Sequence, residues 1–292
     1  MLFVFMKSIN VTKMNGLGND FVLLTKDEFD KTNLTLKDFA IKVCDRHFGI
    51  GADGVIIPKK SDICDVGWYF YQSDGSTAQM CGNGMRVFAK YIFDKGLIKN
   101  KKSFSVETGA GIIQPSIQED GQIKVNMGKP ILIPEKIPCK FNKCFGEELI
   151  IKDKKFKINL VSMGNPHCII FVDENKFKYD IKELAKIYGP IIELDKNFPE
   201  KTNVEFAKIK SRNEIDLSVW ERGCGITLAC GTGACATVVA AIISGLTDNK
   251  VKVNLPGGSL LIEWDGNKEN INNNDIFMTG PANYNFDAKF YV

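Results

Sequence analysis

Two cysteines in this chain, Cys81 and Cys230, each open the short motif Cys-Gly-x-Gly, and each motif leads into apolar residues at helical spacing. A helix N-terminus carries unpaired backbone N–H groups and the positive end of the helix dipole, so a thiol placed there loses its proton more readily. The flanking glycines allow a ligand to approach the backbone, and the same N–H groups can bind a carboxylate. Each motif therefore has the composition of a reactive thiol beside an anion-binding helix end.

The two motifs belong to a longer internal repeat. A Gly-Asn pair precedes each of them, with Asn19 ahead of Cys81 and Asn165 ahead of Cys230 at nearly equal intervals, and a strand-like run follows each pair. Two matched features at similar spacing indicate a duplicated unit. We therefore expect two similar domains, one formed by residues 1–130 with about 279–292 and the other by residues 131–278.

Two thiols facing one cleft from opposite sides suit the inversion of a stereocentre by proton transfer. One cysteine removes a proton as a thiolate base, and the other delivers a proton to the opposite face as a thiol acid. The carbanion-like state needs its carboxylate held by preorganised donors, which the two helix N-termini can supply. This chemistry requires no cofactor and no metal.

Other readings of the cysteines remain open. A lone cysteine beside glycine is more often a buried packing residue than a catalytic one, and this reading stands for the other seven of the nine cysteines. A redox or metal-binding protein is disfavoured, because the chain has no CxxC pair and only two histidines. A noncatalytic binding module is a further alternative, and it predicts that removing Cys81 leaves function intact.

Strand signals dominate both halves, and Gly, Asn, Asp and Pro punctuate them. Residues 111–117 are expected to form a single strand, residues 133–148 a long loop or hairpin, and residues 267–275 a polar loop. Helical spacing is confined to four stretches, 36–46, 84–93, 181–187 and 233–244. Many strands with two helices in each half predict an α+β fold with mainly antiparallel sheets.

Composition sets the broad class of the protein. The chain has 292 residues, 44% of them hydrophobic and 25% charged, with a formal net charge of +3. This charge is too small to indicate a nucleic acid or an anionic membrane as partner. The segment 1–7 lacks the features of a signal peptide and is read as a leading strand, with Met6 as an alternative start to Met1. We expect a cytoplasmic protein with reduced thiols.

Taken together, the motifs resemble those of the diaminopimelate epimerases. The resemblance rests on the segments GLGNDF, HFGIGADG, DGSTAQMCGNGMR, GNPHC, FPEKTNVEF and ERGCGITLACGTG. It extends from near residue 14 to MTGPA at 278–282. The resemblance implies a cofactor-independent isomerase of lysine and peptidoglycan precursor synthesis that interconverts LL- and meso-diaminopimelate. It also implies two pseudosymmetric domains, each a curved sheet around a central helix, and a homodimer.

The resemblance also assigns roles to individual residues. Cys81 and Cys230 match the catalytic pair, and His167 and Glu221 match residues that tune the thiols. The backbone around Gly82, Asn83, Gly231 and Thr232 matches the pockets for the reacting carboxylate. The positions that match substrate-recognition residues are Asn19, Asn165, Asn203, Glu221 and Arg222. Gln72 replaces an asparagine that is common in the family, and we keep it as a substrate-binding candidate.

From the residues alone, Arg222 has the fork geometry to hold a second carboxylate, although a surface salt bridge is an equal reading. The asparagines are also compatible with simple turn roles, and His167 with a buried structural histidine. A proline racemase is the nearest rival function, since it uses a similar cysteine pair. Arg222 favours a substrate with a second charged end, which proline lacks.

Overall fold

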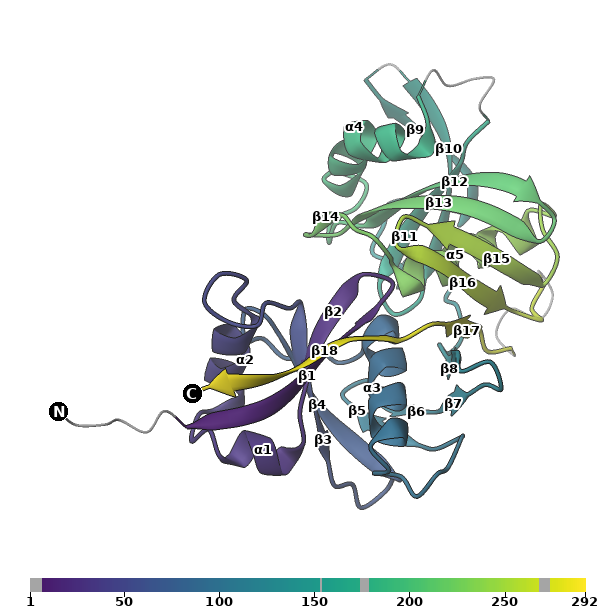
Figure 1. Ribbon diagram of the computed structural model, residues 1–292. Coiled ribbons are helices and arrows are strands. Elements are labelled where there is room, and N and C mark those ends of the chain that lie inside the picture. Colours follow the sequence, from purple (N-terminus) through teal and green to yellow (C-terminus); the bar gives the residue numbers. More distant parts are fainter. Residues whose placement is uncertain (1–6, 153, 174–178, 268–273) are drawn as a thin grey trace. The chain divides into compact units, whose positions relative to one another are not determined.

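A computed structural model describes residues 7–152, 154–173, 179–267 and 274–292, and these form two compact units. The first unit comprises Met1–Val125 with Gly280–Val292, and the second comprises Asn126–Thr279. The C-terminal strand β18 (Asn283–Tyr291) pairs antiparallel with β1 (Ser8–Gly16), as the adjacent yellow and purple arrows in Figure 1 show. The two ends of the chain therefore share one sheet.

The first unit contains one sheet with strand order β18-β1-β2-β3-β4-β5-β6, followed by the hairpin of β7 and β8. Its remaining strands are β2 (Asn19–Leu23), β3 (Gly54–Lys59), β4 (Val66–Gln72), β5 (Val106–Thr108), β6 (Gly111–Ile113), β7 (Pro115–Ile117) and β8 (Ile123–Asn126). Its helices are α1 (Lys26–Asp30), α2 (Leu36–Cys44) and α3 (Gly82–Asp94).

The second unit contains a sheet with strand order β17-β16-β15-β13-β12-β11-β10-β9, and β14 pairs with β13. Its strands are β9 (Phe145–Ile151), β10 (Lys154–Ser162), β11 (Pro166–Phe171), β12 (Asn203–Ser211), β13 (Glu214–Glu221), β14 (Gly225–Ile226), β15 (Lys250–Leu255), β16 (Gly258–Glu263) and β17 (Phe277–Gly280). Its helices are α4 (Ile181–Glu193) and α5 (Gly231–Ile243), and a short 3₁₀ helix spans Pro134–Lys136.

Most neighbouring strands are antiparallel, but each unit has two parallel pairs. These are β2/β3 and β4/β5 in the first unit, and β11/β12 and β13/β15 in the second. Parallel neighbours require a crossover connection, which here contains α1 and α2, α3, α4 and α5 in turn. The two units thus repeat the same order of strands and crossovers, as expected for a duplicated, mainly antiparallel α+β fold.

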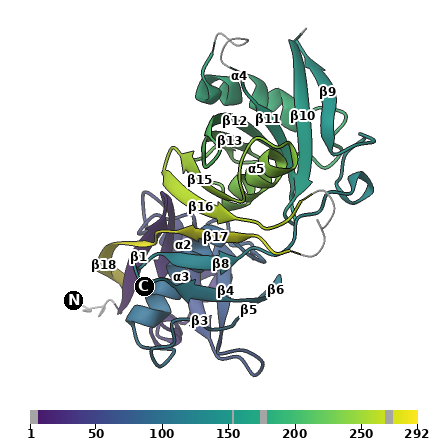
Figure 2. The ribbon, with the colours of Figure 1, turned by 90° about the vertical axis from the view of Figure 1, so that its right-hand side faces the viewer.

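One crossover helix in each unit is enclosed by its sheet. In the second unit α5 contacts β10, β11, β12 and β16, and Figure 2 shows these strands curving round it. Eleven of its 13 residues are buried, so α5 has apolar residues on every side. In the first unit α3 contacts β1, β2, β3 and β7 and buries most of its residues in the same way.

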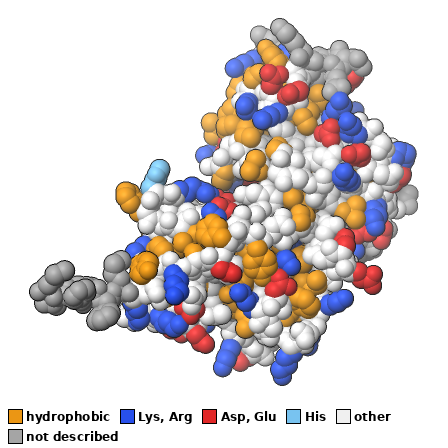
Figure 3. All heavy atoms as spheres, in the orientation of Figure 1, with side chains coloured by type: hydrophobic (Ala, Val, Ile, Leu, Met, Phe, Trp, Pro, Cys, Tyr) orange, Lys and Arg blue, Asp and Glu red, His pale blue; other side chains and the backbone are white. Residues whose placement is uncertain are grey.

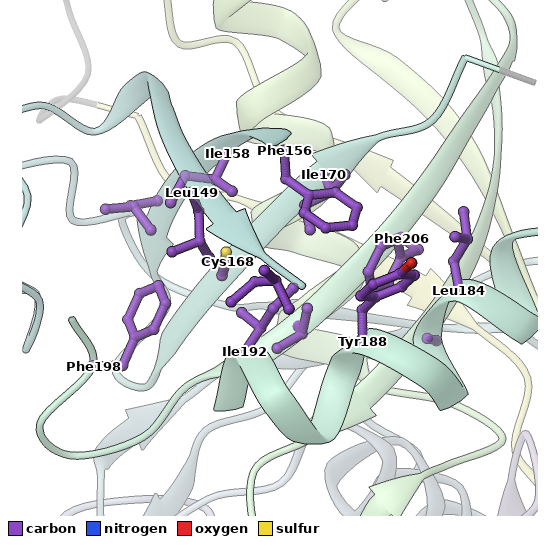
Figure 4. Close-up of a cluster of buried hydrophobic side chains, with 14 of the residues drawn as sticks. Leu149, Phe156, Ile158, Cys168, Ile170, Leu184, Tyr188, Ile192, Phe198 and Phe206 are labelled. Carbon is purple, nitrogen blue, oxygen red and sulfur yellow. The ribbon is translucent and has the colours of Figure 1, made fainter. Parts of the chain in front are cut away.

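The other crossover helices cover the opposite faces of the sheets. In the second unit α4 packs on β12 and β13, where Phe156, Tyr188 and Phe206 form edge-to-face contacts within the cluster drawn in Figure 4. In the first unit α1 and α2 cover a cluster that includes Phe29 and Phe39. Apolar residues on both faces of each sheet fix its position between an inner and an outer helix.

The expected elements agree with this fold apart from a few details. The four helical stretches correspond to α2, α3, α4 and α5, while α1 was not predicted because it spans only five residues. Residues 111–117 form two strands instead of one, separated at Gln114. The loop expected over 133–148 ends where β9 begins at Phe145. The leading strand expected over residues 1–7 and the polar loop over 267–275 lie mostly outside the described residues.

Candidate active site

The two motif cysteines hold the same position in their units, since each is the N-cap of the enclosed helix. The Sγ atom of Cys81 accepts the backbone N–H of Gly84 at 3.4 Å, and the Sγ atom of Cys230 accepts that of Gly233 at 3.3 Å. A side-chain acceptor at this position satisfies one of the N–H groups that a helix start leaves unpaired. Each sulfur is therefore fixed at the positive end of a 13-residue helix.

The last glycine of each motif lies against closely packed side chains. A Cβ atom at Gly84 would lie 3.2 Å from Cδ1 of Ile56. A Cβ atom at Gly233 would lie 2.8 Å from Oε1 of Glu205 and 3.1 Å from the Sγ atom of Cys230. A side chain at Gly233 would therefore displace Glu205 or the sulfur of Cys230, whereas one at Gly84 would require only a small shift of Ile56.

In the first unit the side chain of Asn19, at the start of β2, orients the thiol of Cys81. Its Nδ2 donates to Oδ2 of Asp53 at 2.6 Å, which directs Oδ1 toward Cys81 and Asn83. That oxygen accepts from the Cys81 thiol at 3.7 Å and from Nδ2 of Asn83 at 3.3 Å. Because a carbonyl oxygen only accepts, Cys81 carries its proton in this arrangement.

A charge cluster behind Asn19 holds this corner of the first unit together. Asp20 pairs with Nζ of Lys13 at 2.8 Å and with Nη2 of Arg46 at 2.9 Å. Burial acts to raise the pKa of Asp20, but its hydrogen bonds to Arg46 and Lys13 outweigh burial and lower it. Arg46 also contacts Oδ1 of Asp53 at 2.8 Å, so Asp53 is fixed as the acceptor for Asn19.

In the second unit Asn165 and Thr232 lie beside Cys230. Nδ2 of Asn165 donates to Oγ1 of Thr232 at 3.4 Å, and Oγ1 lies 3.5 Å from the Sγ atom of Cys230. Oδ1 of Asn165 lies 3.1 Å from Nε2 of His167, whose Nδ1 lies 2.7 Å from Oε1 of Glu205. His167 and Glu205 are both fully buried. Cys230 is thus the end of a polar network that begins inside the sheet.

The end of β13 and the loop after it carry Glu221 and Arg222. Thr227 donates its hydroxyl to Oε1 of Glu221. Asn203 is buried and accepts the backbone N–H of Arg222 at 2.9 Å, while its Nδ2 donates to the carbonyl of Pro166 at 2.8 Å. Asn203 therefore joins the start of β11, between Asn165 and His167, to the loop that carries Arg222.

The Arg222 loop is anchored a second time by Glu193 at the end of α4. Its Oε1 accepts the backbone N–H of Gly223 at 2.9 Å, and its Oε2 accepts Nε1–H of Trp220 at 2.7 Å. The Arg222 side chain is exposed, and its Nη1 donates to the carbonyl of Glu200 at 3.1 Å. A rigid backbone thus presents an accessible guanidinium, as recognition of an anion requires.

The environment of Cys230 disfavours its charged form. Burial is the largest cause that raises its pKa well above the usual value, and the nearby carboxyls of Glu221 and Glu205 add to this effect. The hydrogen bonds from Thr232 and Gly233 act in the opposite direction. Burial likewise raises the pKa of Glu221. A thiolate formed at Cys230 is consequently a stronger base than an ordinary cysteine thiolate.

The structure brings most of the predicted site residues to the two capped helix ends. Cys81, Gly82, Asn83 and Asn19 lie together in the first unit. Those that lie together in the second unit are Asn165, His167, Asn203, Glu221, Arg222, Cys230, Gly231 and Thr232. Gln72 is exposed at the end of β4, where its backbone pairs with Ser76 at 2.8 Å. We find no side-chain contact that joins Gln72 to Cys81 among the described residues.

Sequence reasoning missed three carboxylates that support these sites. Asp53 directs Asn19, Glu205 contacts His167, and Glu193 anchors the Arg222 loop. The signal for Glu205 was a single acidic residue between Val204 and Phe206 in the buried first half of β12. Asp53 and Glu193 gave no comparable signal, because each is close in space to residues far away in the sequence.

All nine cysteines lie within the described residues and are free thiols. Burial raises the pKa of Cys44 and of Cys144 to about 12 and places that of Cys168 well above its usual value, which fits packing roles. Within the part of the chain that the structure describes, no three His, Cys, Asp or Glu side chains are grouped as metal ligands would be.

Comparison with known proteins places the chain in a family. The sequence profile described as diaminopimelate epimerase matches residues 11–133 and 159–285. The chain belongs to the diaminopimelate epimerase family. Diaminopimelate epimerase of Desulfitobacterium hafniense is 45% identical over 287 residues, covering 95% of this chain and 96% of the relative. That of Carboxydothermus hydrogenoformans is 46% identical over 288 residues, covering 96% and 98%.

Solved structures share the fold at low sequence identity. A hydroxyproline epimerase from Agrobacterium vitis aligns with a TM-score of 0.68 at 13% identity, covering 99% of this chain and 94% of that one. A phenazine biosynthesis protein of the PhzF family from Bacillus anthracis aligns with a TM-score of 0.67 at 17% identity, covering 98% and 100%. These likenesses concern the two-unit fold alone.

Among the described residues, no helix is both long and apolar enough to span a membrane. On the face drawn in Figure 3, basic and acidic side chains are interspersed. This mixture of charges agrees with the small net charge of the sequence.

The raised pKa of Cys230 leads to a first prediction. Because burial favours the neutral thiol, the reactive thiolate should become populated only above the pH at which an ordinary thiol ionises. In the substrate-free protein, iodoacetamide labelling of Cys230, resolved by peptide mass spectrometry, should rise with a midpoint above that of glutathione in the same tube. A midpoint at or below that of glutathione would show that the helix dipole outweighs burial.

Proposed function

We propose that this protein interconverts LL- and meso-diaminopimelate by two-base proton transfer at the α-carbon, without a cofactor. Cys81 and Cys230 are the proposed acid–base pair, and each acts as the base in one direction of the reaction and as the acid in the other. Membership of the diaminopimelate epimerase family supports the reaction, and the equivalent placement of two free thiols at helix N-caps supports the mechanism. The mechanistic proposal rests on the equivalent placement of the two thiols at helix N-caps.

The proposed step conserves protons within the pair of thiols. The thiolate takes the α-proton and becomes a thiol, and the electron pair stays on the α-carbon and its carboxylate. The other thiol then delivers its proton to the opposite face of that carbon and becomes a thiolate. Each turnover therefore leaves the two cysteines with exchanged protonation states, which solvent proton exchange resets.

In the substrate-free protein, Cys81 is proposed to be the protonated partner. Its thiol donates to Oδ1 of Asn19, whose amide is oriented by Asp53. Cys230 has instead a hydroxyl and a backbone N–H as neighbours, and both of these can donate to sulfur. We propose that Cys230 becomes the thiolate when substrate binds, because the ammonium group of the amino acid favours negative charge nearby.

The negative charge that develops on the reacting carboxylate is proposed to be stabilised by the two helix starts. The backbone N–H groups at Gly82, Asn83, Gly231 and Thr232 lie in the first turns of α3 and α5, where helices leave N–H groups unpaired. Donors that are fixed before the reaction stabilise such charge without reorganisation. The remaining proposed contacts to substrate are Asn19, Gln72, Asn165, Asn203, Glu221 and Arg222, and His167 with Glu221 is proposed to tune Cys230.

Arg222 is proposed to hold the distal carboxylate of diaminopimelate. Its exposed guanidinium rests on a loop fixed by Asn203 and Glu193, so little is lost in ordering it. Proline racemase activity is the alternative, and the shared fold of a hydroxyproline epimerase is compatible with it. A residue positioned for a second carboxylate favours diaminopimelate, because proline has only one.

The setting of the enzyme follows from this chemistry. Both thiols must be reduced, which points to the cytoplasm, and the reaction belongs to lysine biosynthesis. We also propose a homodimer, which rests on the family resemblance alone. Neither a nucleic acid nor a membrane is needed as a partner.

Replacing either cysteine tests the two-base mechanism. Cys81→Ala and Cys230→Ala should each lower the rate of LL-to-meso conversion by about 10³-fold or more, because one of the two proton transfers loses its group. Chiral chromatography of the product measures the rate, and isothermal titration should show that substrate still binds. Cys139→Ala, which changes a half-buried thiol away from both helix ends, serves as the control and should retain activity.

Two results would overturn this account. One is a cysteine variant at either motif that still turns over at a rate comparable to wild type. The other is racemisation of proline by the wild type with no turnover of diaminopimelate.

Arg222→Met tests recognition of the distal end. Loss of the guanidinium should raise KM for diaminopimelate by about 10- to 100-fold, because a charge-assisted hydrogen bond contributes about 1.5–3 kcal/mol. Arg212→Met is the matched control, since Arg212 is also exposed but pairs with Asp248 at the β12–β13 turn. Steady-state kinetics of both variants measures the effect. Equal KM values for the two would remove Arg222 from the substrate site.

A further inference from the structure

A continuous chain of polar contacts runs through the second unit from Glu205 to Cys230. Oε1 of Glu205 lies 2.7 Å from Nδ1 of His167, and Nε2 of His167 lies 3.1 Å from Oδ1 of Asn165. Nδ2 of Asn165 lies 3.4 Å from Oγ1 of Thr232, which lies 3.5 Å from the Sγ atom of Cys230. The histidine ring, the hydroxyl and the thiol can each donate or accept a hydrogen bond. The distances alone therefore allow donation to run from Glu205 toward Cys230 or the other way.

The orientation of the Asn165 amide shows which direction the chain takes. Asn165 presents its amide nitrogen to Thr232, and that nitrogen can only donate. Its carbonyl oxygen therefore faces His167, and this oxygen can only accept. It follows that Nε2 of His167 carries a proton.

The buried end of the chain must be consistent with that proton. His167 and Glu205 are both 0% exposed, and Oε2 of Glu205 has no hydrogen-bond partner among the described residues. A lone carboxylate with so little support is costly in such surroundings, and burial raises the pKa of Glu205. A second proton held between Oε1 and Nδ1 makes the pair neutral overall, whichever of the two atoms it rests on.

We propose that Glu205 is a positioning residue that sets the direction of this chain, so that the Thr232 hydroxyl donates its hydrogen to the sulfur of Cys230. Oγ1 of Thr232 already accepts from Asn165, and its single hydrogen is therefore available to Cys230. A hydrogen bond donated to sulfur stabilises the thiolate form. This inference rests on the proposed function, since it explains how Cys230 is prepared to act as a base.

Neutrality of the Glu205–His167 pair has a second consequence for Cys230. A Cβ atom at Gly233 would contact both Oε1 of Glu205 and the Sγ atom of Cys230, so the carboxyl group and the thiol are near neighbours. A negative charge on Glu205 would oppose a second one on the sulfur. The proton shared with His167 weakens that opposition, while the pair still supplies the Nε2 proton that the chain needs.

The chain distinguishes the two cysteines. Asn83 occupies in the first unit the motif position that Thr232 occupies in the second, and Cys81 donates its own proton to Asn19. Cys230 is instead placed to receive a hydrogen bond from Thr232. The repeated fold therefore carries two different hydrogen-bond arrangements, one that favours the thiol and one that favours the thiolate.

Nitrogen NMR of ¹⁵N-histidine-labelled protein tests the direction of the chain. The chain has only two histidines, and the exposed His47 can be assigned with His47→Gln. We expect the Nε2 signal of His167 to be that of a protonated nitrogen in the substrate-free protein, as the contact with Asn165 requires. An unprotonated Nε2 in the wild type would overturn the proposal.

Variants at both ends of the chain test its effect on Cys230, with iodoacetamide labelling at fixed pH as the readout. Thr232→Val should label about tenfold more slowly than the wild type, and Thr232→Ser, which keeps the hydroxyl, about as fast. Glu205→Met should slow labelling severalfold and allow both His167 tautomers. Glu205→Gln can still donate to Nδ1 and should restore the wild-type rate and the Nε2 proton.

Equal labelling of Thr232→Val and Thr232→Ser would refute the last link, and wild-type behaviour of a folded Glu205→Met would refute the role of Glu205. If Glu205→Met does not fold, the histidine spectra of the wild type and the Thr232 pair still decide the question. None of these measurements uses substrate. Failure of epimerase turnover in the wild type would therefore refute the proposed function separately.

Discussion

The cap that each cysteine sulfur places on its own helix is the interaction on which the candidate site depends. Gly84 and Gly233 donate their N–H groups to Cys81 and Cys230, and these contacts fix each sulfur at the positive end of a buried helix. In the second unit the glycine three residues after the cysteine also leaves room for the sulfur of Cys230 and the carboxyl group of Glu205, which a side chain there would crowd. Reactivity and local folding are thus set by the same atoms.

The fold makes this arrangement repeatable. Within each unit, a crossover helix joins two parallel strands and is wrapped by the sheet, so its N-terminus lies at an edge where neighbouring loops converge. Those loops differ between the units, so the polar partners of the cysteine sulfur differ as well. Asp53 and Asn19 direct a carbonyl oxygen to Cys81, whereas Asn165 and Thr232 direct a hydroxyl to Cys230. The same backbone fold therefore holds two thiols with different hydrogen-bond partners.

The sequence predicted the duplicated fold and the two capped cysteines well, because both depend on local patterns. In both units the Cys-Gly-x-Gly motif ahead of apolar residues at helical spacing marks a helix start. The partners of the supporting carboxylates were beyond reach, since Asp53 meets Asn19 and Glu205 meets His167 only after distant strands pair. Their roles depend on burial and on the direction of hydrogen bonds, which no local pattern encodes.

The most direct test of the two-base account follows deuterium in the wild-type enzyme. Epimerisation of LL-diaminopimelate in deuterated water should give meso product that already carries one α-deuterium early in the reaction, while the remaining LL substrate stays largely undeuterated. The reason is that the proton delivered comes from a different thiol than the one that removed the α-hydrogen. Product that retains the original α-hydrogen in early turnovers would show that a single base serves both faces, and would contradict the account.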